Sequence, residues 1–464
     1  MDRGATIHIS FFRKRPTSDA PRKHEGDRLG AGVPRFRLAD ATRRRIVIRV
    51  ALVLVCALCA TQADADGDAS STALPLRRYE LAGFPIIGGS TDIGVQFGGA
   101  ATFTRFYDQA FPYAWNIDLL LSASIKDENG VRLAQQSHVL RLDAPDLWSG
   151  KLRLDTRASF QRTINLGYYG LGNAASATPN RYYQYYWYLQ QEGRVRSIMR
   201  LHTPVRGLDA AIGANLRYEA PQLYTSPVDG PSKLSQDVAQ SQAGSGPQIL
   251  GSESALLASL SAGVMYDTRD SEFVTRHGAF YQAGMGATLG SSERIAYGEA
   301  AAVLAHYASL ARPLVFASRF VASFEFGRVP FYDLAQGGIF EPQYLLGGET
   351  GVRGVPQGRY AGRVKIVSNL EIRATPFPRF KVVGQSLLIG TTTFFDAGRV
   401  WEDYAIISRT DGDHLGLKFG VGVGAFLQWG QAAIFRIEIA YSPDAEAENA
   451  NLPFGIYVSD GLMF

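Results

Sequence analysis

The chain has 464 residues, a formal charge of +4, 46% hydrophobic and 19% charged residues, with 49 Gly, 26 Phe, 22 Tyr and only 2 Cys. These values exclude a disordered chain and a disulfide-rich scaffold. A helical membrane protein does not fit either, because the one long apolar run, 46–60, contains Arg49. A large globular protein or a membrane β-barrel remains, and the glycine and aromatic content favours β structure.

The first segment of the chain resembles an export signal. Residues 1–45 are polar and basic, the apolar run 46–60 follows, and the small residues at 63–65 fit a cleavage site. This order predicts a secretory signal peptide or leader over 1–65. The alternative is an N-terminal membrane anchor, which the short uninterrupted apolar stretch disfavours.

Removing this leader changes the charge balance. Residues 1–65 hold 13 of the 47 basic and six of the 43 acidic residues, so the remainder is slightly acidic. The positive formal charge therefore gives no indication of nucleic-acid binding. Cys56 and Cys59 also lie in the leader, which leaves a cysteine-free mature chain that suits an oxidising compartment.

Alternation of apolar with polar or small residues dominates the rest of the chain, as in 91–98 and 384–398. No amphipathic helix is expected after residue 66. A short periplasmic segment is expected over 66–89, followed by a barrel over 90–464. Sixteen strands are predicted, at 90–106, 113–126, 131–143, 150–164, 181–190, 194–203, 209–220, 254–268, 277–290, 295–309, 312–327, 360–375, 385–400, 414–428, 431–442 and 453–464.

The connections between these strands alternate between short and long, and the longest are 221–253 and 328–359. Short turns at one end and long loops at the other are typical of outer-membrane barrels. A soluble propeller or double sandwich would also show alternating strands. The export signal, the lack of cysteine and a last strand that ends in Phe464 favour the barrel. We therefore predict an all-β protein, a sixteen-stranded antiparallel transmembrane β-barrel of the bacterial outer membrane.

The long loop 328–359 contains the segment Leu-Leu-Gly-Gly-Glu-Thr-Gly-Val-Arg-Gly-Val at 345–355. This segment resembles the GG…VRG(F/Y) motif of the BamA/TamA bacterial surface antigen superfamily. Four further segments match that family in the expected order, at 266–270, 369–373, 394–401 and 436–441. The resemblance implies a sixteen-stranded barrel that inserts or translocates other proteins. The sequence departs from the family in having Val355 where an aromatic is usual and in leaving no room for periplasmic POTRA domains.

Arg353 within this motif has two interpretations, a solvated surface cation or a cation on a loop folded into the lumen. Glycines let a backbone approach closely and turn sharply, which favours a folded loop. Alternation with lipid-facing apolar neighbours turns Glu371 and Asp396 to the lumen, and an Arg guanidinium can bind such carboxylates bidentately. We therefore expect these three side chains to form an internal cluster, and the resemblance implies the same roles. The loop motif consists of Gly347, Gly348, Val352, Arg353 and Gly354.

The resemblance implies further sites. A weak seam is expected between the first strand, 91–106, and the last, 453–464, which would open laterally to template client strands. Glycines fit weak pairing there, Gly98 and Gly99 in the first strand and Gly455 and Gly461 in the last. The hairpin motif comprises Asp267, Arg269 and Asp270. Phe464, on the outward face of the last strand, is the expected assembly signal.

No pattern in the sequence indicates catalysis. Nucleophile, phosphate-loop and metalloprotease motifs are missing, and the five histidines after residue 65 lack metal-ligand spacing. We therefore expect no enzyme activity, metal or cofactor. The predicted function is protein insertion or translocation, and the alternatives are a passive pore for small solutes or a translocator dedicated to one secreted partner. The expected partners are outer-membrane lipid, client proteins and the barrel-assembly machinery.

Overall fold

The computed structural model describes residues 78–107, 113–127, 130–177, 183–226, 228–382, 385–406, 408–429, 433–445, 454–460 and 462–464. The predicted leader over 1–65 and the seam residue Gly461 lie outside this set.

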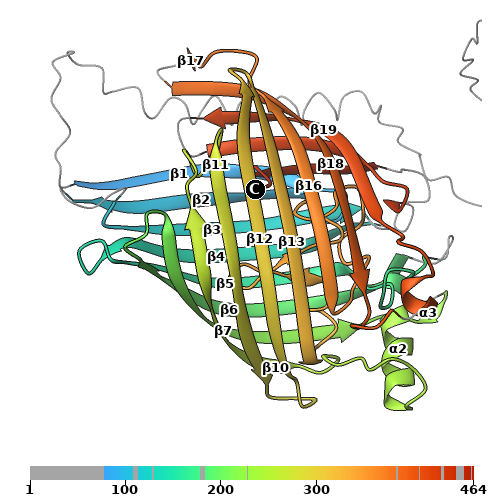
Figure 1. Cartoon of the computed structure of the whole chain (residues 1–464). Coiled ribbons are helices and arrows are strands. Elements are labelled where there is room, and N and C mark those ends of the chain that lie inside the picture. Colours follow the sequence, from blue (N-terminus) through green and yellow to red (C-terminus); the bar gives the residue numbers. More distant parts are fainter. Residues whose placement is uncertain are drawn as a thin grey trace, which may run out of the picture. The chain divides into compact units, whose positions relative to one another are not determined.

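Sixteen long strands of the described chain form one closed antiparallel barrel, in which each strand pairs with its neighbours along the chain and β21 returns to β1 (Figure 1). This confirms the predicted fold class. The barrel strands are β1 (Arg78–Ser90), β2 (Gly94–Phe106), β3 (Trp115–Asp127), β4 (Val131–Leu147), β5 (Leu152–Gly167), β6 (Trp187–His202), β7 (Leu208–Leu223), β10 (Ala255–Asp267), β11 (Gly278–Gly290), β12 (Ala296–Ala311), β13 (Leu314–Arg328), β16 (Val364–Ala374), β18 (Gln385–Trp401), β19 (Lys418–Trp429), β20 (Ala433–Tyr441) and β21 (Phe454–Asp460).

Smaller elements lie in the connections between the barrel strands. The short strand β17 (Phe380–Val382) pairs with β18. The others are β8 (Thr225–Ser226), β9 (Gly230–Pro231), β14 (Gln336–Gly337), β15 (Gln343–Tyr344), the 3-10 turn η2 (Tyr183–Tyr186), α2 (Lys233–Gln242) and α3 (Ser408–Asp411).

The two faces of the wall follow the alternation in the sequence. In β16, Leu370 and Ile372 are exposed on the outer face, whereas Glu371 and Arg373 are buried inside. An apolar outer face is what lipid contact requires, because charged side chains at mid-depth of a bilayer cost ~2–4 kcal/mol. The interior is correspondingly polar and charged.

The number of strands is right only because two errors cancel, one strand that was not predicted and one that was predicted as two. The first barrel strand is β1, which begins at Arg78, so part of the predicted periplasmic segment 66–89 belongs to the barrel. Gly83, Pro85 and Gly88 interrupt the alternation of β1 and hide it. Conversely, the predicted strands 181–190 and 194–203 contribute to one continuous strand, β6, because the glycine between them is paired within the sheet rather than in a turn.

The connections define two ends of the barrel. One end, which we name the long-loop end, carries 168–186, 224–254, 329–363, 402–417 and 442–453. The other, the short-turn end, carries 148–151, 203–207 and 312–313, together with the start of β1 and the end of β21. Short turns face the periplasm in barrels of this kind. The interior therefore has a periplasmic mouth at the short-turn end.

Helix α2 in the connection 224–254 is an element that the sequence did not predict. Its cap is Ser232, whose side chain accepts a hydrogen bond from the Ser235 N–H, and Leu234 and Val238 are buried in a cluster with Phe331. Only these two apolar residues mark its inner face, which is too weak a pattern to distinguish from a loop. Figure 1 shows α2 at the opposite end of the barrel from β17.

Among the described residues, no helix is long and apolar enough to cross a membrane.

Candidate functional site: the lumen loop and its anchors

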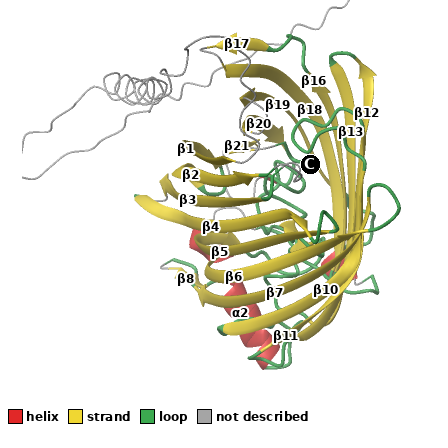
Figure 2. Ribbon diagram, turned by 90° about the vertical axis from the view of Figure 1, so that its left-hand side faces the viewer, coloured by secondary structure: helices red, strands yellow, loops and turns green. Residues whose placement is uncertain are grey.

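The connection 329–363 between β13 and β16 folds into the barrel interior, and we name it the lumen loop (Figure 2). Leu345, Val352 and Val355 are fully buried against a cluster that includes Val321 and Val367 of the wall. Val355, which stands where the family motif has an aromatic, therefore serves as a packing residue. The loop is a folded part of the core, held by apolar contacts along its length.

The glycines of the motif allow the tight course of this loop. Gly347 has a φ of +125°, Gly348 of +76° and Gly354 of +91°, which other residues rarely adopt. A Cβ at Gly347 would overlap the carbonyl oxygen of Pro356. The turn that presents Arg353 to the wall therefore requires glycine at this position.

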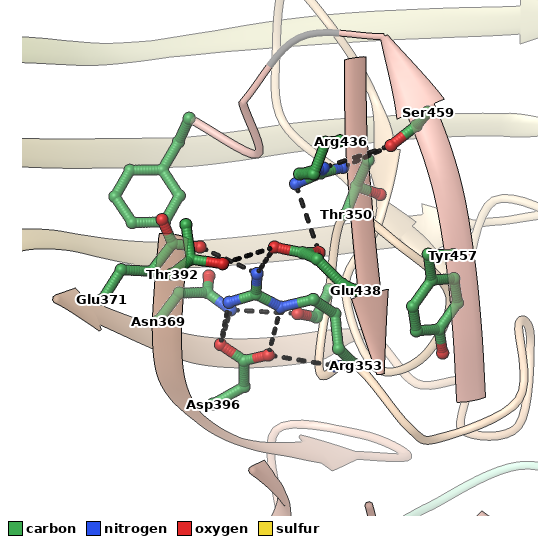
Figure 3. A network of polar contacts seen from close by, with 12 residues as sticks. Thr350, Arg353, Asn369, Glu371, Thr392, Asp396, Arg436, Glu438, Tyr457 and Ser459 are labelled. Carbon is green, nitrogen blue, oxygen red and sulfur yellow. Dashed lines mark hydrogen bonds and ion pairs between the residues drawn. The ribbon is translucent and has the colours of Figure 1, made fainter. Parts of the chain in front are cut away.

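Arg353 is the centre of a buried ionic cluster, which we name the arginine lock (Figure 3). Its guanidinium donates to Asp396 through Nε at 2.8 Å and Nη2 at 3.0 Å, and its Nη1 donates to Glu371 at 2.8 Å. Its backbone N–H also donates to Asp396, at 3.1 Å. The structure thus brings together the three side chains that the sequence analysis grouped.

A third carboxylate, Glu438 of β20, completes the lock and was missed by the sequence analysis. Arg353 Nη1 donates to Glu438 Oε1 at 2.9 Å. Glu438 lies between Ile437 and Ile439, which are exposed on the outer face, so alternation alone places it inside. The alternation of outward and inward residues that indicated Glu371 and Asp396 therefore also indicates Glu438.

Two further arginines balance the charge of these carboxylates. Arg373 Nε donates to Glu371 at 2.8 Å, and Arg436 Nη1 lies 3.5 Å from Glu438. Burial disfavours the charged form of Arg353, but the three carboxylates outweigh this effect and raise the pKa of its guanidinium well above the ordinary value. The lock is thus a buried network of three arginines and three acids that ties the loop to β16, β18 and β20.

The backbone at Arg353 lies directly against β19. A Cβ added at Gly420 would overlap the Arg353 carbonyl oxygen, and the Gly354 N–H donates to the Tyr457 hydroxyl at 2.9 Å. Tyr457 belongs to β21, so the loop also contacts the last strand.

Replacing Gly420 by Ala is expected to displace the lumen loop. The added methyl has no space beside the Arg353 carbonyl, and overpacking of this kind costs about 1–3 kcal/mol. Denaturant unfolding of the purified protein measures the loss. Gly193→Ala is the matched control, because a Cβ there meets nothing within 4 Å. Equal stability of the two variants would contradict the close contact between Gly420 and the Arg353 carbonyl.

The lumen loop has a second anchor at Asp333, near its start. Arg217 of β7 donates to both oxygens of Asp333, at 2.8 and 2.6 Å, and the Tyr297 hydroxyl of β12 donates at 2.7 Å. Burial opposes ionisation of Asp333, but the charge of Arg217 and these hydrogen bonds outweigh it and hold the pKa of the carboxyl below its ordinary value. No pattern in the sequence indicates this pair.

The depressed pKa of Asp333 predicts an acid-dependent contribution to stability. The contribution is full above the ordinary carboxyl pKa of 3.8 and is lost as the pH falls through the lower folded-state value. Asp333→Asn should therefore reduce the free energy of unfolding by about 2 kcal/mol at neutral pH. The difference between the two proteins should shrink in unfolding titrations below about pH 4. A difference that stays constant with pH would show that Asp333 is not ionised in the fold.

The seam between the first and last strands is short. Among the described residues, two pairs join β1 to β21, Gly89 with Val458 and Ser90 with Tyr457, whereas β1 and β2 pair along their whole length. One further hydrogen bond runs from the Thr91 N–H to the Ile456 carbonyl at 3.0 Å. The barrel is therefore least firmly paired at this position.

The predicted seam residues Gly98 and Gly99 do not lie at the seam. They belong to β2, where they face Ile86 and Pro85 of β1, because the true first strand begins twelve residues before the predicted one. Gly455 lies in β21 opposite Ala440 of β20. Of the predicted seam residues that the structure describes, only Gly455 is therefore in a seam strand.

The hairpin motif lies away from the lock, at the short-turn end between β10 and β11. Arg269 donates to both oxygens of Asp267, at 3.0 and 2.8 Å. Asp270 accepts from the backbone N–H groups of Arg276 and His277, at 3.0 and 3.3 Å. These contacts stabilise a turn, and they bring none of the three residues to Arg353.

The predicted outward orientation of Phe464 is wrong. β21 ends at Asp460, and Phe464 packs inside the barrel with its ring 6.2 Å from that of Tyr307, an inward residue of β12. Its main-chain oxygen accepts a hydrogen bond from Arg373 at 2.8 Å. Cationic and aromatic partners in the lumen therefore determine where this residue lies.

Within the described part of the chain, no group of His, Cys, Asp and Glu side chains has the arrangement of a metal site.

A family model described as the Omp85 superfamily domain matches residues 100–464. Among solved structures, the chain is similar to BamA from Haemophilus ducreyi lacking POTRA domains 1–3, with a TM-score of 0.53 and 16% identity over 83% of this chain and 70% of that one. It also matches CdiB from Acinetobacter baumannii, with a TM-score of 0.46 and 12% identity over 82% of this chain and 59% of that one. For CdiB from Escherichia coli the TM-score is 0.48 and the identity is 14%, over 84% of this chain and 64% of that one. The chain thus spans less than two thirds of either CdiB chain, and no curated protein matches it by sequence.

Proposed function

The chain belongs to the Omp85 superfamily of the bacterial outer membrane, and we propose that its barrel assists the insertion or translocation of other proteins there through the seam between β1 and β21. The single observation that carries the proposal is the unequal pairing of β1. One edge of this strand pairs with β2 along its length, and the other is bonded to β21 only near Ser90.

An unpaired strand edge presents a row of free backbone N–H and C=O groups, which is a template for another strand. On the edge of β1 that faces β21, residues 78–88 pair with none of the described residues of β21. A client strand could add to this edge by backbone hydrogen bonding and leave the rest of the sheet unchanged. Such a step needs no nucleotide or cofactor, because strand pairing itself is favourable.

The arginine lock lies on the β21 side of the seam, because Glu438 belongs to β20, which pairs with β21. It ties the lumen loop to β16, β18 and β20, none of which borders β1. We expect the lock to hold these three strands together while β1 separates from β21. The contact of Tyr457 with Gly354 then links the last strand to the loop, so that loop position and seam closure are coupled.

The test is quantitative proteomics of outer membranes from a deletion strain, its parent and the strain complemented with the full chain. Depletion of several other barrel proteins, restored by complementation, supports an insertase. Loss of one secreted product indicates a translocator dedicated to one partner. If only the deleted protein is missing, the insertion and translocation proposal fails and a passive pore for small solutes takes its place.

A further inference from the structure

A cavity of about 330 Å³ lies in the lumen between the lumen loop and the short-turn end. Its wall includes Arg269 and Glu272 of the turn 268–277, and Arg141 and Arg153 on either side of the turn 148–151. Gly338 and Phe340 of the lumen loop form its inner limit. We name it the lumen cavity. Its lining reaches the short-turn end, where a polypeptide from the periplasm would arrive.

Arginines outnumber acidic side chains in the lining of the lumen cavity, and one of them has no charged partner. Four of its arginines have carboxylate partners within the wall, at 2.5 to 2.8 Å. The arginines that line it are Arg141, Arg153, Arg200, Arg269 and Arg319, the acidic side chains are Asp155, Glu272 and Glu341, and the C-terminal residue Phe464 lines it as well.

Arg319 of β13 is the arginine without a charged partner. It is 5% exposed, and its guanidinium donates to two neutral oxygens, the Thr350 carbonyl at 2.9 Å and Gln343 Oε1 at 2.8 Å. No carboxylate of the described residues lies within ion-pair distance of it, and those of the nearby lock are bound by Arg353 and Arg373. A buried charge without an opposite charge is unfavourable, so an anion in the cavity would relieve this cost.

A row of arginines crosses three adjacent strands of the wall. Arg141 of β4, Arg157 of β5 and Arg196 of β6 are directly opposite one another in the register of three adjacent strands. Like charges in such positions destabilise a sheet. Arg157 is exposed and forms no ion pair with any described side chain, and Arg196 has only Glu341 of the lumen loop at 3.3 Å. The three adjacent arginines therefore lower the stability of this part of the wall.

We propose that the lumen cavity and this arginine row bind the carboxylates of an acidic, extended polypeptide segment. The inference rests on the proposed function and specifies the chemistry of its client. Glu341 shows how a chain presents a carboxylate to the row, and its 61% exposed side chain can be displaced. Planar guanidinium groups match carboxylates bidentately.

The aromatic lining favours a polypeptide over a small inorganic anion. Phe280, Tyr307 and Phe340 line the cavity beside the arginines. Such a mixture of cationic and apolar surface fits a segment in which acidic residues alternate with apolar ones.

The test is binding of a fluorescent peptide of alternating Glu and Ala residues to the purified full chain in detergent. The Glu peptide should bind, and its Gln-for-Glu counterpart should not. Arg319→Gln and Arg157→Gln should each weaken binding about tenfold, the effect of losing one charge-assisted hydrogen bond. Arg206→Gln, an exposed arginine in the turn 203–207 at the same end, should leave it unchanged.

Arg157 is exposed, so its replacement leaves the fold intact even where Arg319→Gln does not. Equal binding of the two peptides, or unchanged affinity of Arg157→Gln, would overturn the proposal. Binding of inorganic phosphate without binding of the Glu peptide would also overturn it, in favour of a small-anion site. If the peptide does not bind but the deletion strain still loses its barrel proteins, the proposed binding of acidic segments is refuted while the proposed insertion function stands.

Discussion

Reversing the charge of Arg353 should prevent the barrel from folding stably. Glu at this position would face Asp396, Glu371 and Glu438, which accept from the guanidinium at 2.8 to 3.0 Å in a site without solvent. Removing one partner of a buried ion pair costs about 3–5 kcal/mol, and a fourth carboxylate adds repulsion. Arg353→Glu should therefore lower the free energy of unfolding by more than about 4 kcal/mol in denaturant titrations.

A second substitution separates loss of charge balance from loss of shape. Adding Asp396→Arg to Arg353→Glu restores an opposite pair and should recover part of the lost stability. Arg363→Glu is the matched control, because this arginine lies at the end of the same loop and its side chain is partly exposed beside Asp403. A single variant Arg353→Glu that unfolds like the native protein would refute the structural role of the lock.

Crosslinking the seam should abolish activity. Thr91 follows the Ser90–Tyr457 pair and donates its backbone N–H to the Ile456 carbonyl at 3.0 Å, so cysteines at positions 91 and 456 should be able to form a disulfide. A covalent bond there holds β1 against β21 and denies a client the free edge. In the deletion strain, the oxidised variant should therefore fail to restore the outer-membrane proteome, and reduction should recover it.

The control for the seam crosslink is a disulfide within a permanently paired part of the wall. Ile87 of β1 and Phe97 of β2 are register partners on the exposed outer face. A cysteine pair at these positions should form the bond without affecting function. Full activity with the Thr91–Ile456 pair oxidised would exclude seam opening as the mechanism.

Most of the fold could be predicted from the sequence because lipid and lumen impose opposite demands on successive residues. β16 is the clearest case, since its apolar outer residues and charged inner residues alternate without a break. The alternation is weaker in β1, where glycines and Pro85 interrupt it, and the strand was overlooked. At Gly193 a turn was predicted where the strand β6 continues, because a glycine within a long strand resembles a turn.

The candidate site could be predicted only as far as the wall is regular. Glu371 and Asp396 follow from alternation, and Glu438 carried the same signal. The pairing of Asp333 with Arg217 depends on the course of a long irregular loop, which no periodicity describes. Phe464 was misplaced for a related reason, since alternation was extended past the end of β21 into a segment that turns into the lumen.

The most direct measurement is the rate at which an unfolded outer-membrane protein folds into liposomes that contain the purified full chain. Protein-containing liposomes should accelerate folding over empty ones, and oxidation of the Thr91–Ile456 cysteine pair should remove the acceleration. Equal rates in both kinds of liposome, together with steady ion conductance through the protein, would contradict insertion and identify the barrel as a pore.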